Sequence, residues 1–228
     1  MSKGIFITGT GTDIGKTYVT ALIIKKLTIA GLSASYYKAA VSGNVKGAEG
    51  IICGDAEYVK TIAGLSDDAS TMVSYVYEKA YSPHLASRIE DNPVEIEKVK
   101  SDFRRVCKKY EYVTVEGSGG ILCPIRYDEK IIFLEDIIKE LQLSALIVAD
   151  ASLGTINSTV LTAYYMKQKG IAIKGIIINN YHPYDVMQED NIKMIQEMTG
   201  IPVLATVKRG ATELEMEIQE LISLYDVI

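Results

Sequence analysis

The sequence contains few residues suited to disulfides or zinc sites. Its 228 residues include three cysteines and two histidines. Cys53, Cys107 and Cys123 lie far apart, and no two of them form a Cys-x-x-Cys pair. The odd number and wide spacing predict free thiols in a reducing compartment. Because only His84 and His182 could assist the thiols, a zinc site is not expected.

Long apolar runs are also missing. A membrane-spanning helix needs about 20 consecutive apolar residues, and no stretch approaches that length. The opening residues, MSKGIFITG, reach glycine after a short apolar run and do not resemble a signal peptide. These features predict a cytoplasmic protein with no membrane partner.

The chain has no excess of positive charge. Lys and Arg number 24 against 29 Asp and Glu, which gives a formal net charge of −5. Nucleic-acid binding needs a basic surface, so no nucleic-acid partner is expected. The hydrophobic fraction of 48% is enough for a large core. The length suits one α/β domain over residues 1–228.

Apolar runs alternate with amphipathic segments along the whole chain. The runs are short, rich in Ile and Val, and not alternating, which is typical of strands buried on both faces of a parallel sheet. Repeated strand–helix units predict a doubly wound, mostly parallel sheet with helices on both faces. Residues 39–54 are polar and irregular, and a loop of this length is often functional. The expected strands are 3–9, 33–39, 72–77, 111–116, 144–150, 173–180 and 201–207, and the expected helices 18–30, 55–64, 94–110, 158–170, 190–200 and 212–225.

Residues 9–17, GTGTDIGKT, join the first expected strand to the first expected helix. Glycines and a helix N-terminus favour a phosphate-binding loop, because backbone N–H groups can approach the anion closely. Lys16 would reach the β- and γ-phosphates, and the Thr17 hydroxyl would hold Mg²⁺. The common loop has its first glycine where Thr10 stands, so the spacer here is one residue longer. A glycine-rich turn with an incidental lysine is the alternative.

This longer spacing resembles the loop GTxTxxGKT of the dethiobiotin synthetases. The resemblance covers most of the chain, and its segments follow the family order. Two departures stand out: Ala39 replaces a proline in the second segment, which loosens that turn, and Lys208 replaces a proline near the nucleotide base, which predicts altered base recognition. The matching segments are YYKAAVSG (36–43), GDAEYV (54–59), SPHLAS (82–87), VEGSGG (115–120), LGTINSTVLT (153–162) and INN (178–180).

The resemblance implies a P-loop NTPase-like fold and an ATP-dependent carbon–nitrogen ligase. The family closes a cyclic urea from 7,8-diaminopelargonate and CO₂, giving dethiobiotin, ADP and phosphate. The route passes through a carbamate and a carbamic–phosphoric anhydride. ATP is the implied co-substrate and Mg²⁺ the implied cofactor.

Lys16 and Lys38 are the expected catalytic residues. The carbamate, the triphosphate and the substrate carboxylate are all anions, so bringing them together requires fixed positive charge. Both lysines lie near the carboxyl ends of the first two expected strands and can face one crevice. Thr17, Asp55 and Glu116 supply the hard oxygen ligands that Mg²⁺ prefers. A surface lysine at 38 and a helix-capping carboxylate at 55 are the alternatives.

The resemblance also assigns nucleotide and substrate contacts. The side-chain amides of Asn179 and Asn180 suit the edge of adenine, although a turn would explain them equally well. The stretch 154–157 comes from the neighbouring subunit in the family, which implies a homodimer with shared sites. The expected nucleotide-binding residues are Thr12, Asp13, Ile14, Gly15, Lys16, Thr17, Tyr18, Asp55, Glu116, Gly117, Ser118, Gly119, Asn179, Asn180, Val207 and Lys208, and the expected substrate-binding residues Thr12, Ser42, Gly119, Gly154, Thr155, Ile156 and Asn157.

Two other P-loop classes are alternatives. A cobyrinate-type amide ligase carries a separate glutaminase domain, for which 228 residues leave no room. A ParA/MinD-like switch ATPase, as used in partitioning or septum placement, carries an early lysine in a K-G-G pattern. Thr10, Gly11 and Thr12 occupy that region here. The acidic segment 212–228 also disfavours binding to an anionic membrane.

Overall fold

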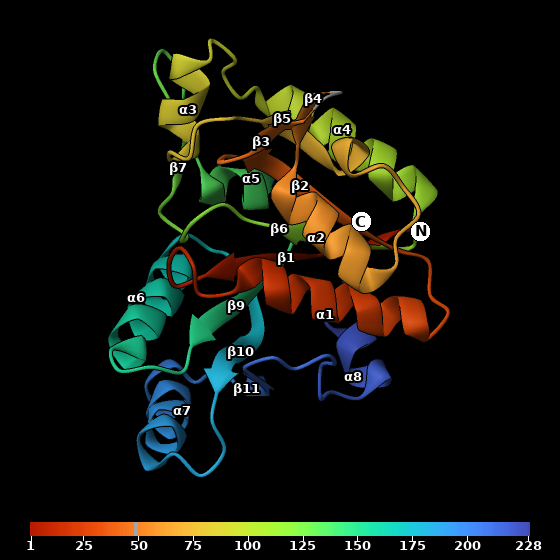
Figure 1. The fold of residues 1–228 in the computed structure, drawn as a ribbon. Coiled ribbons are helices and arrows are strands. Elements are labelled where there is room, and N and C mark those ends of the chain that lie inside the picture. The colour runs from red at the N-terminus through yellow and green to blue at the C-terminus, as the bar shows by residue number, and fades with distance from the viewer. Residues whose placement is uncertain (48–49) are drawn as a thin grey trace.

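A parallel sheet forms the centre of the molecule (Figure 1). The computed structural model describes the backbone of residues 1–47 and 50–228, and the side chains of residues 1–45 and 53–228. The strand order is β11-β10-β9-β1-β6-β2-β5, and every pair in this order is parallel. The predicted doubly wound sheet is confirmed. The strands are β1 (Lys3–Gly9), β2 (Ala34–Val41), β5 (Val73–Val76), β6 (Tyr112–Glu116), β9 (Ala145–Asp150), β10 (Ile173–Tyr181) and β11 (Val203–Lys208), and β12 (Asp226–Val227) pairs antiparallel with the start of β1.

Helices cover both faces of the sheet, so the core lies in two layers. On β1, Ile5 and Ile7 belong to one layer, while Phe6 between them belongs to the other. Both layers are apolar, which explains why the strand sequences do not alternate. Burial of each such side chain contributes about 1.5–3 kcal/mol. The first layer holds α1 (Lys16–Ile29), α2 (Gly54–Ala63) and α8 (Ile218–Ser223), and the second holds α4 (Ile96–Lys109), α5 (Leu134–Glu140), α6 (Thr155–Gln168) and α7 (Val186–Thr199).

Several short elements are absent from the sequence prediction. The hairpin of β7 (Pro124–Tyr127) and β8 (Ile131–Phe133) leads directly into α5. The expected loop 39–54 is partly regular, because β2 continues to Val41 and a hairpin of β3 (Val45–Gly47) and β4 (Gly50–Ile52) follows. Residues 48–49 of that loop lie outside the described backbone. A 3₁₀-helix, η1 (Ala69–Met72), precedes β5. In the SPHLAS segment, by contrast, Ser82 and Pro83 are typical of a helix start, and α3 (Pro83–Ile89) begins there and lies against β7.

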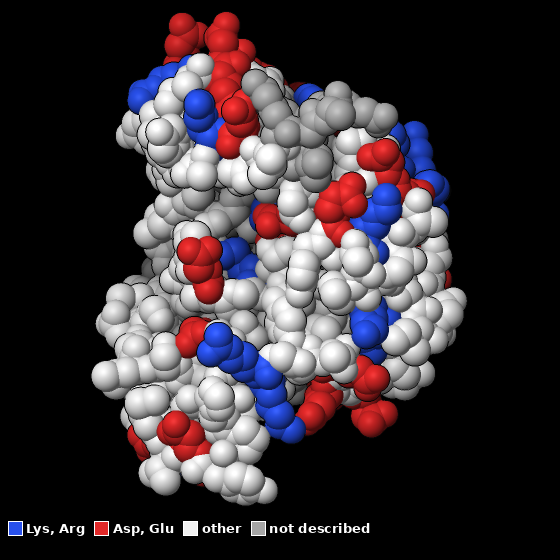
Figure 2. All heavy atoms as spheres, in the orientation of Figure 1, with Lys and Arg blue, Asp and Glu red and all other residues white. Residues whose placement is uncertain are grey.

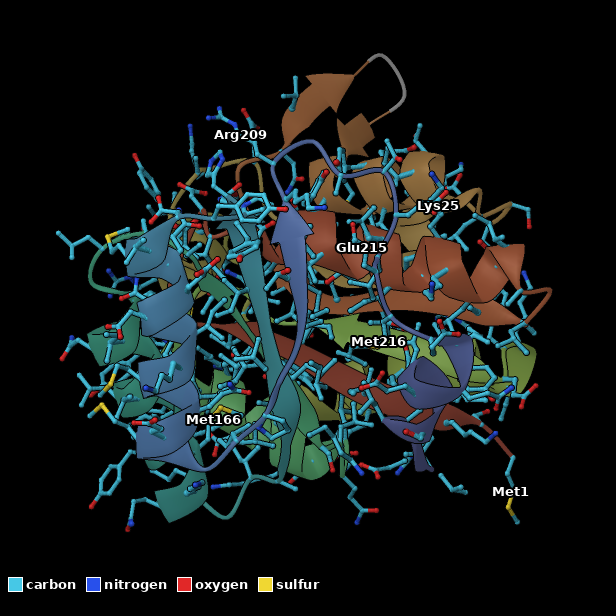
Figure 3. The ribbon with its side chains drawn as sticks, turned by 90° about the horizontal axis from the view of Figure 1, so that it is seen from below. Met1, Lys25, Met166, Arg209, Glu215 and Met216 are labelled. Carbon is cyan, nitrogen blue, oxygen red and sulfur yellow. The ribbon has the colours of Figure 1, made fainter. Side chains whose placement is uncertain are left out.

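The predicted helix 212–225 is wrong in its first half, because α8 begins only at Ile218. The segment before it, residues 209–217, runs along α1 without helical structure, as Figure 3 shows around Lys25, Glu215 and Met216. Side chains of α1 donate to carbonyls of this segment, so those carbonyls need no helical partners. The side chains of Leu214 and Met216 are buried. The bonds run from the Tyr18 hydroxyl to Ala211, from Lys25 Nζ to Thr212 (3.0 Å) and from Lys26 Nζ to Leu214 (3.1 Å).

None of the helices in the described parts of the chain has the length and hydrophobicity of a membrane span.

Candidate active site

A cleft of about 900 Å³ lies where β1, β2 and β6 end. The loop before α1, the first turn of α2, the chain before α3 and the glycines after β6 border it. The hollow opens on the face seen in Figure 2, with basic and acidic side chains close together inside it. Ligands of open parallel sheets bind at this carboxyl edge, so the cleft is the candidate active site.

The loop of residues 9–17 has the geometry of an anion site. Gly15, with φ of 88°, is left-handed and immediately precedes α1. No side chain caps α1, so backbone N–H groups of its first turn remain for a ligand. Lys16 Nζ donates to the Gly11 carbonyl at 2.7 Å, which folds the lysine over its own loop. Burial lowers the pKa of Lys16, and the nearby charge of Lys38 lowers it further.

Lys38 lies on the floor of the cleft between two carboxylates. Its Nζ donates to Asp55 Oδ2 at 2.7 Å and to Glu116 Oε1 at 2.8 Å. Burial by itself lowers the pKa of Lys38, but the Glu116 and Asp55 carboxylates outweigh that effect and raise the pKa above its ordinary value. The side chain therefore stays protonated at neutral pH and provides a fixed positive charge.

Hard oxygen atoms lie around the Glu116 carboxylate. The Thr17 hydroxyl donates to Glu116 Oε1 at 2.8 Å, and the Tyr36 hydroxyl donates to Glu116 Oε2 at 3.0 Å. Burial, followed by the Glu116 charge, holds the pKa of Tyr36 well above its ordinary value, so this hydroxyl remains a donor. Thr17, Glu116 and Asp55 thus present oxygens to one place. This donor set fits Mg²⁺, which keeps several waters and needs only one or two carboxylates.

The comparisons with known proteins match nearly the whole chain. A family model described as an AAA domain matches residues 3–212. The chain is 53% identical over 216 residues to the ATP-dependent dethiobiotin synthetase BioD of Brachyspira hyodysenteriae, covering 94% of this chain and 96% of the relative. It is 48% identical over 228 residues to the ATP-dependent dethiobiotin synthetase BioD of Clostridium botulinum strain Langeland, with both chains fully covered. The chain belongs to the dethiobiotin synthetase family. The expectation of a ligase of biotin biosynthesis is thereby confirmed.

Solved structures agree on the fold. The MinC:MinD cell division complex of Aquifex aeolicus matches with a TM-score of 0.57 at 16% identity, covering 91% of this chain and 81% of that chain. A ParA family ATPase of Chlorobium tepidum matches with a TM-score of 0.57 at 13% identity, covering 98% and 90%. At such low identity these likenesses show the fold alone, and they confirm the P-loop NTPase-like architecture.

Most residues predicted from the dethiobiotin synthetase segments line the cleft. They come from three separate parts of the chain, which the sheet brings to one edge. Ser118 Oγ, for example, donates to the Ala40 carbonyl at 2.6 Å, which ties the glycines after β6 to the end of β2. The predicted residues that line the cleft are Thr12, Asp13, Gly15, Lys16, Thr17, Tyr18, Lys38, Ser42, Asp55, Glu116, Ser118 and Gly119.

The remaining predicted residues do not line the cleft. Asn179 donates through Nδ2 to the Ile14 carbonyl at 3.0 Å, and Asn180 donates to Asp150 Oδ2 at 2.6 Å. Lys208, at the end of β11, pairs with Glu215 at 3.2 Å. The others are Ile14, Gly117, the buried Val207, and the stretch Gly154, Thr155, Ile156 and Asn157 where α6 begins.

Some cleft residues are missing from the sequence prediction. Tyr58 lies three positions after Asp55 on α2, so helical spacing could have indicated it. Cys123 follows the glycines of the VEGSGG segment, and burial raises the pKa of its thiol to about 11. The SPHLAS segment resembles the family, yet none of its residues was assigned to the site. The additional lining residues are Val41, Tyr58, Ala80, Tyr81, Ser82, Pro83 and Cys123.

Proposed function

We propose that this chain, as an ATP-dependent enzyme of dethiobiotin synthesis, closes the cyclic urea of dethiobiotin from 7,8-diaminopelargonate and CO₂. The proposal rests on one observation. Lys16 and Lys38 line the same cleft as Glu116 and Asp55, which both bond Lys38, in a chain 53% identical to a named dethiobiotin synthetase. The described chain acts as one catalytic domain, in the cytoplasm.

The reaction has three steps. One amine of the substrate attacks CO₂ and loses a proton, which gives a carbamate. A carbamate oxygen takes the γ-phosphoryl group of ATP, releasing ADP and forming a carbamic–phosphoric anhydride. The second amine attacks the carbonyl carbon, the C–O bond to phosphate breaks, and the ring closes with loss of a proton. Each step joins or creates anions, so positioning and positive charge supply most of the catalysis.

The two lysines have different tasks. Lys16 follows the left-handed Gly15 and reaches over the loop, so it binds the β- and γ-phosphates of the nucleotide. Lys38 is buried and held by Glu116 and Asp55, so its charge faces the carbamate and the phosphoryl group during transfer. Neither task requires a lysine to give up its proton.

Mg²⁺ would be held by Thr17, Asp55 and Glu116, together with phosphate oxygens and water. The fit rests on the convergence of their oxygen atoms, since the Thr17 hydroxyl and Lys38 Nζ both bond Glu116 Oε1. When bound, the ion neutralises charge on the phosphates. Tyr36, which donates to the other oxygen of Glu116, keeps this carboxylate in place.

The diamine head of the substrate lies among Thr12, Ser42 and Gly119, and the nucleotide base lies towards Asn179, Asn180, Val207 and Lys208. The far carboxylate of the substrate then needs a second anion site. Backbone N–H groups in the stretch Gly154, Thr155, Ile156 and Asn157, where α6 begins, supply that site from another subunit, although the N–H of Thr155 already donates to the Ser152 carbonyl at 3.2 Å.

A homodimer follows from this arrangement. The start of α6 does not line the cleft of its own chain, and the apolar side chains around it are exposed. Leu153, Leu161 and Tyr164 are 84%, 59% and 63% exposed. A second copy would cover them in a closed two-fold contact, with each cleft completed by the partner.

A coupled assay tests the proposal. The protein is mixed with ATP, Mg²⁺ and bicarbonate, and ADP release is followed before and after 7,8-diaminopelargonate is added. We expect release to require the diamine. A switch ATPase would instead release ADP at the same rate without the diamine, and an amide ligase would require glutamine or ammonia.

A further inference from the structure

Asn179 bonds the phosphate-binding loop itself. We infer that Asn179 is a positioning residue, whose amide nitrogen holds the peptide between Ile14 and Gly15 in the conformation that binds the triphosphate. This inference rests on the proposed function, because it assumes that the loop binds a triphosphate. This positioning role differs from a contact with the nucleotide base, which would use Oδ1 of the same side chain.

The hydrogen bond joins distant parts of the sheet. Asn179 lies near the end of β10, and β9 separates β10 from β1. The Asn179 side chain nevertheless reaches the loop that follows β1, where its Nδ2 donates to the Ile14 carbonyl at 3.0 Å. Asn179 is only 3% exposed, so water competes little for this bond. The neighbouring Asn180 turns to Asp150 instead, so only one of the two amides reaches the loop.

The loop is shaped to receive this amide. A Cβ atom on Gly15 would lie 2.0 Å from Asn179 Nδ2, so only glycine permits the approach. Gly15 is also left-handed, with φ of 88°, which other residues adopt at a cost. Because a trans peptide directs its C=O and N–H in opposite directions, holding the Ile14 carbonyl also orients the N–H of Gly15. Lys16, which lines the cleft, follows directly.

The two polar atoms of the amide have separate roles. Nδ2 is engaged by the loop, whereas the buried Oδ1 has no hydrogen-bond partner within the described residues. Oδ1 is therefore the atom left for a donor such as a base amino group. Positioning through Nδ2 affects every ligand that carries the phosphates, while a base contact through Oδ1 affects only ligands that carry the base.

Tripolyphosphate separates these roles, because it has the phosphates and no base. Affinities of Asn179→Ala and Asn179→Ser for Mg²⁺–tripolyphosphate and for a non-hydrolysable ATP analogue are measured by calorimetry. We expect both ligands to bind about tenfold or more weakly, by similar factors, since a buried partner is lost. Unchanged tripolyphosphate affinity with weakened analogue binding would overturn the inference and leave Asn179 as a base contact.

Asn191→Ala is the matched control. Asn191 is also buried, and its amide donates to the Ala151 carbonyl at 3.3 Å, away from the cleft. We expect this variant to lose thermal stability but to bind tripolyphosphate like the wild type. If Asn191→Ala bound tripolyphosphate as weakly as the Asn179 variants, the inference would be overturned, because the loss of affinity would come from a general loosening of the fold. So would a failure of both Asn179 variants to fold, because the amide would then be needed for the fold itself.

The wild type distinguishes this inference from the proposed function. If it binds neither ligand, the proposed ATP site is wrong. If it binds the ATP analogue but not tripolyphosphate, the ATP site stands, but the loop is not an independent phosphate site and the role of Asn179 is overturned.

Discussion

Lys38 is the buried cation around which the cleft is organised. Glu116 and Asp55 both accept hydrogen bonds from it, and they keep its pKa above the ordinary value although burial alone would lower it. The charge is thus present before any ligand arrives, which avoids reorganisation during phosphoryl transfer. This position suits a group that stabilises charge formed during the reaction.

We expect Lys38→Ala to reduce turnover far more than nucleotide affinity. In the proposed mechanism the resting triphosphate lies over the loop and Lys16, whereas Lys38 would serve the carbamate and the transferring phosphoryl group. Turnover in the coupled assay should fall by about two to three orders of magnitude. Calorimetry with a non-hydrolysable ATP analogue should show a small change. A collapse of nucleotide affinity with normal turnover at saturation would assign Lys38 to the resting nucleotide instead.

We expect Lys16→Ala to lower turnover by roughly two to three orders of magnitude, because a charged contact to the transferring phosphate is lost. The fold should survive, as judged by thermal unfolding, since among the described residues the Lys16 side chain donates to its own loop, at the Gly11 carbonyl. Lys193→Ala is the control, because Lys193 lies exposed on α7. Near-normal turnover in Lys16→Ala would remove the loop from the mechanism.

The sequence predicted the centre of the cleft better than its rim. The spacing of residues 9–17 and the acidic end of β6 identified Lys16, Thr17 and Glu116, which the structure brings together. Tyr81 was missed because an aromatic side chain on a loop carries no motif of its own, and Tyr58 because only the aspartate of its segment, GDAEYV, was assigned to the site. Their place in the cleft depends on how α2 and the chain before α3 are arranged around β2.

Among the secondary-structure elements, the segment 209–217 departs most from prediction. Its acidic, apolar pattern is helical in period, but side chains of α1 bond its carbonyls and Leu214 is buried against that helix. The periodicity of a sequence does not reveal tertiary contacts of this kind, which here outweigh the helical pattern of the segment. The β7–β8 hairpin and α5 were missed because elements of three to seven residues give too short a pattern.

We expect the Lys208 position to broaden base selectivity. Lys208 ends β11 and its only described ion pair is with Glu215, so a flexible cation stands where the resemblance implies a rigid proline ring. Turnover with ATP, GTP, CTP and UTP should therefore differ little, and Lys208→Pro should sharpen the preference. A strong preference for ATP that Lys208→Pro leaves unchanged would contradict this role.

We expect the free energy of unfolding to depend on pH through Asp102, whose carboxylate on α4 accepts a hydrogen bond from Ser74 on β5. Burial by itself raises the pKa of Asp102, but Lys98, Ser74 and Arg105 outweigh it, so the net pKa is lowered. A carboxyl with a lowered folded-state pKa stabilises the fold above its unfolded pKa, and this stability is lost as the pH falls through the folded pKa.

Asp102→Ala should therefore lower the free energy of unfolding by about 1–3 kcal/mol at pH 7. The difference from the wild type should shrink as the solution is acidified below the ordinary carboxyl range. Urea unfolding at several pH values measures both effects, with Asp102→Asn as the uncharged control of the same shape. A difference that stays constant with pH would show that the charge of Asp102 contributes nothing.

For the whole molecule, the proposed two-fold assembly makes a prediction about mixed subunits. Lys16→Ala and Asn157→Pro, which removes a backbone N–H in the first turn of α6, should each be inactive, since each damages one part of both sites. After subunit exchange, the mixed dimer holds one intact site, so activity should return in part. Continued inactivity despite exchange, or full activity of a sedimenting monomer, would refute the shared site.

We propose that one cleft, with two lysines of different function, closes a urea ring with ATP. The most direct measurement uses ¹³C-bicarbonate with ATP, Mg²⁺ and 7,8-diaminopelargonate, and follows phosphate release and product mass together. The proposed reaction predicts dethiobiotin with one heavy carbon, formed in equal amount to the phosphate released. Phosphate release that needs no diamine, or a product without the label, would contradict it.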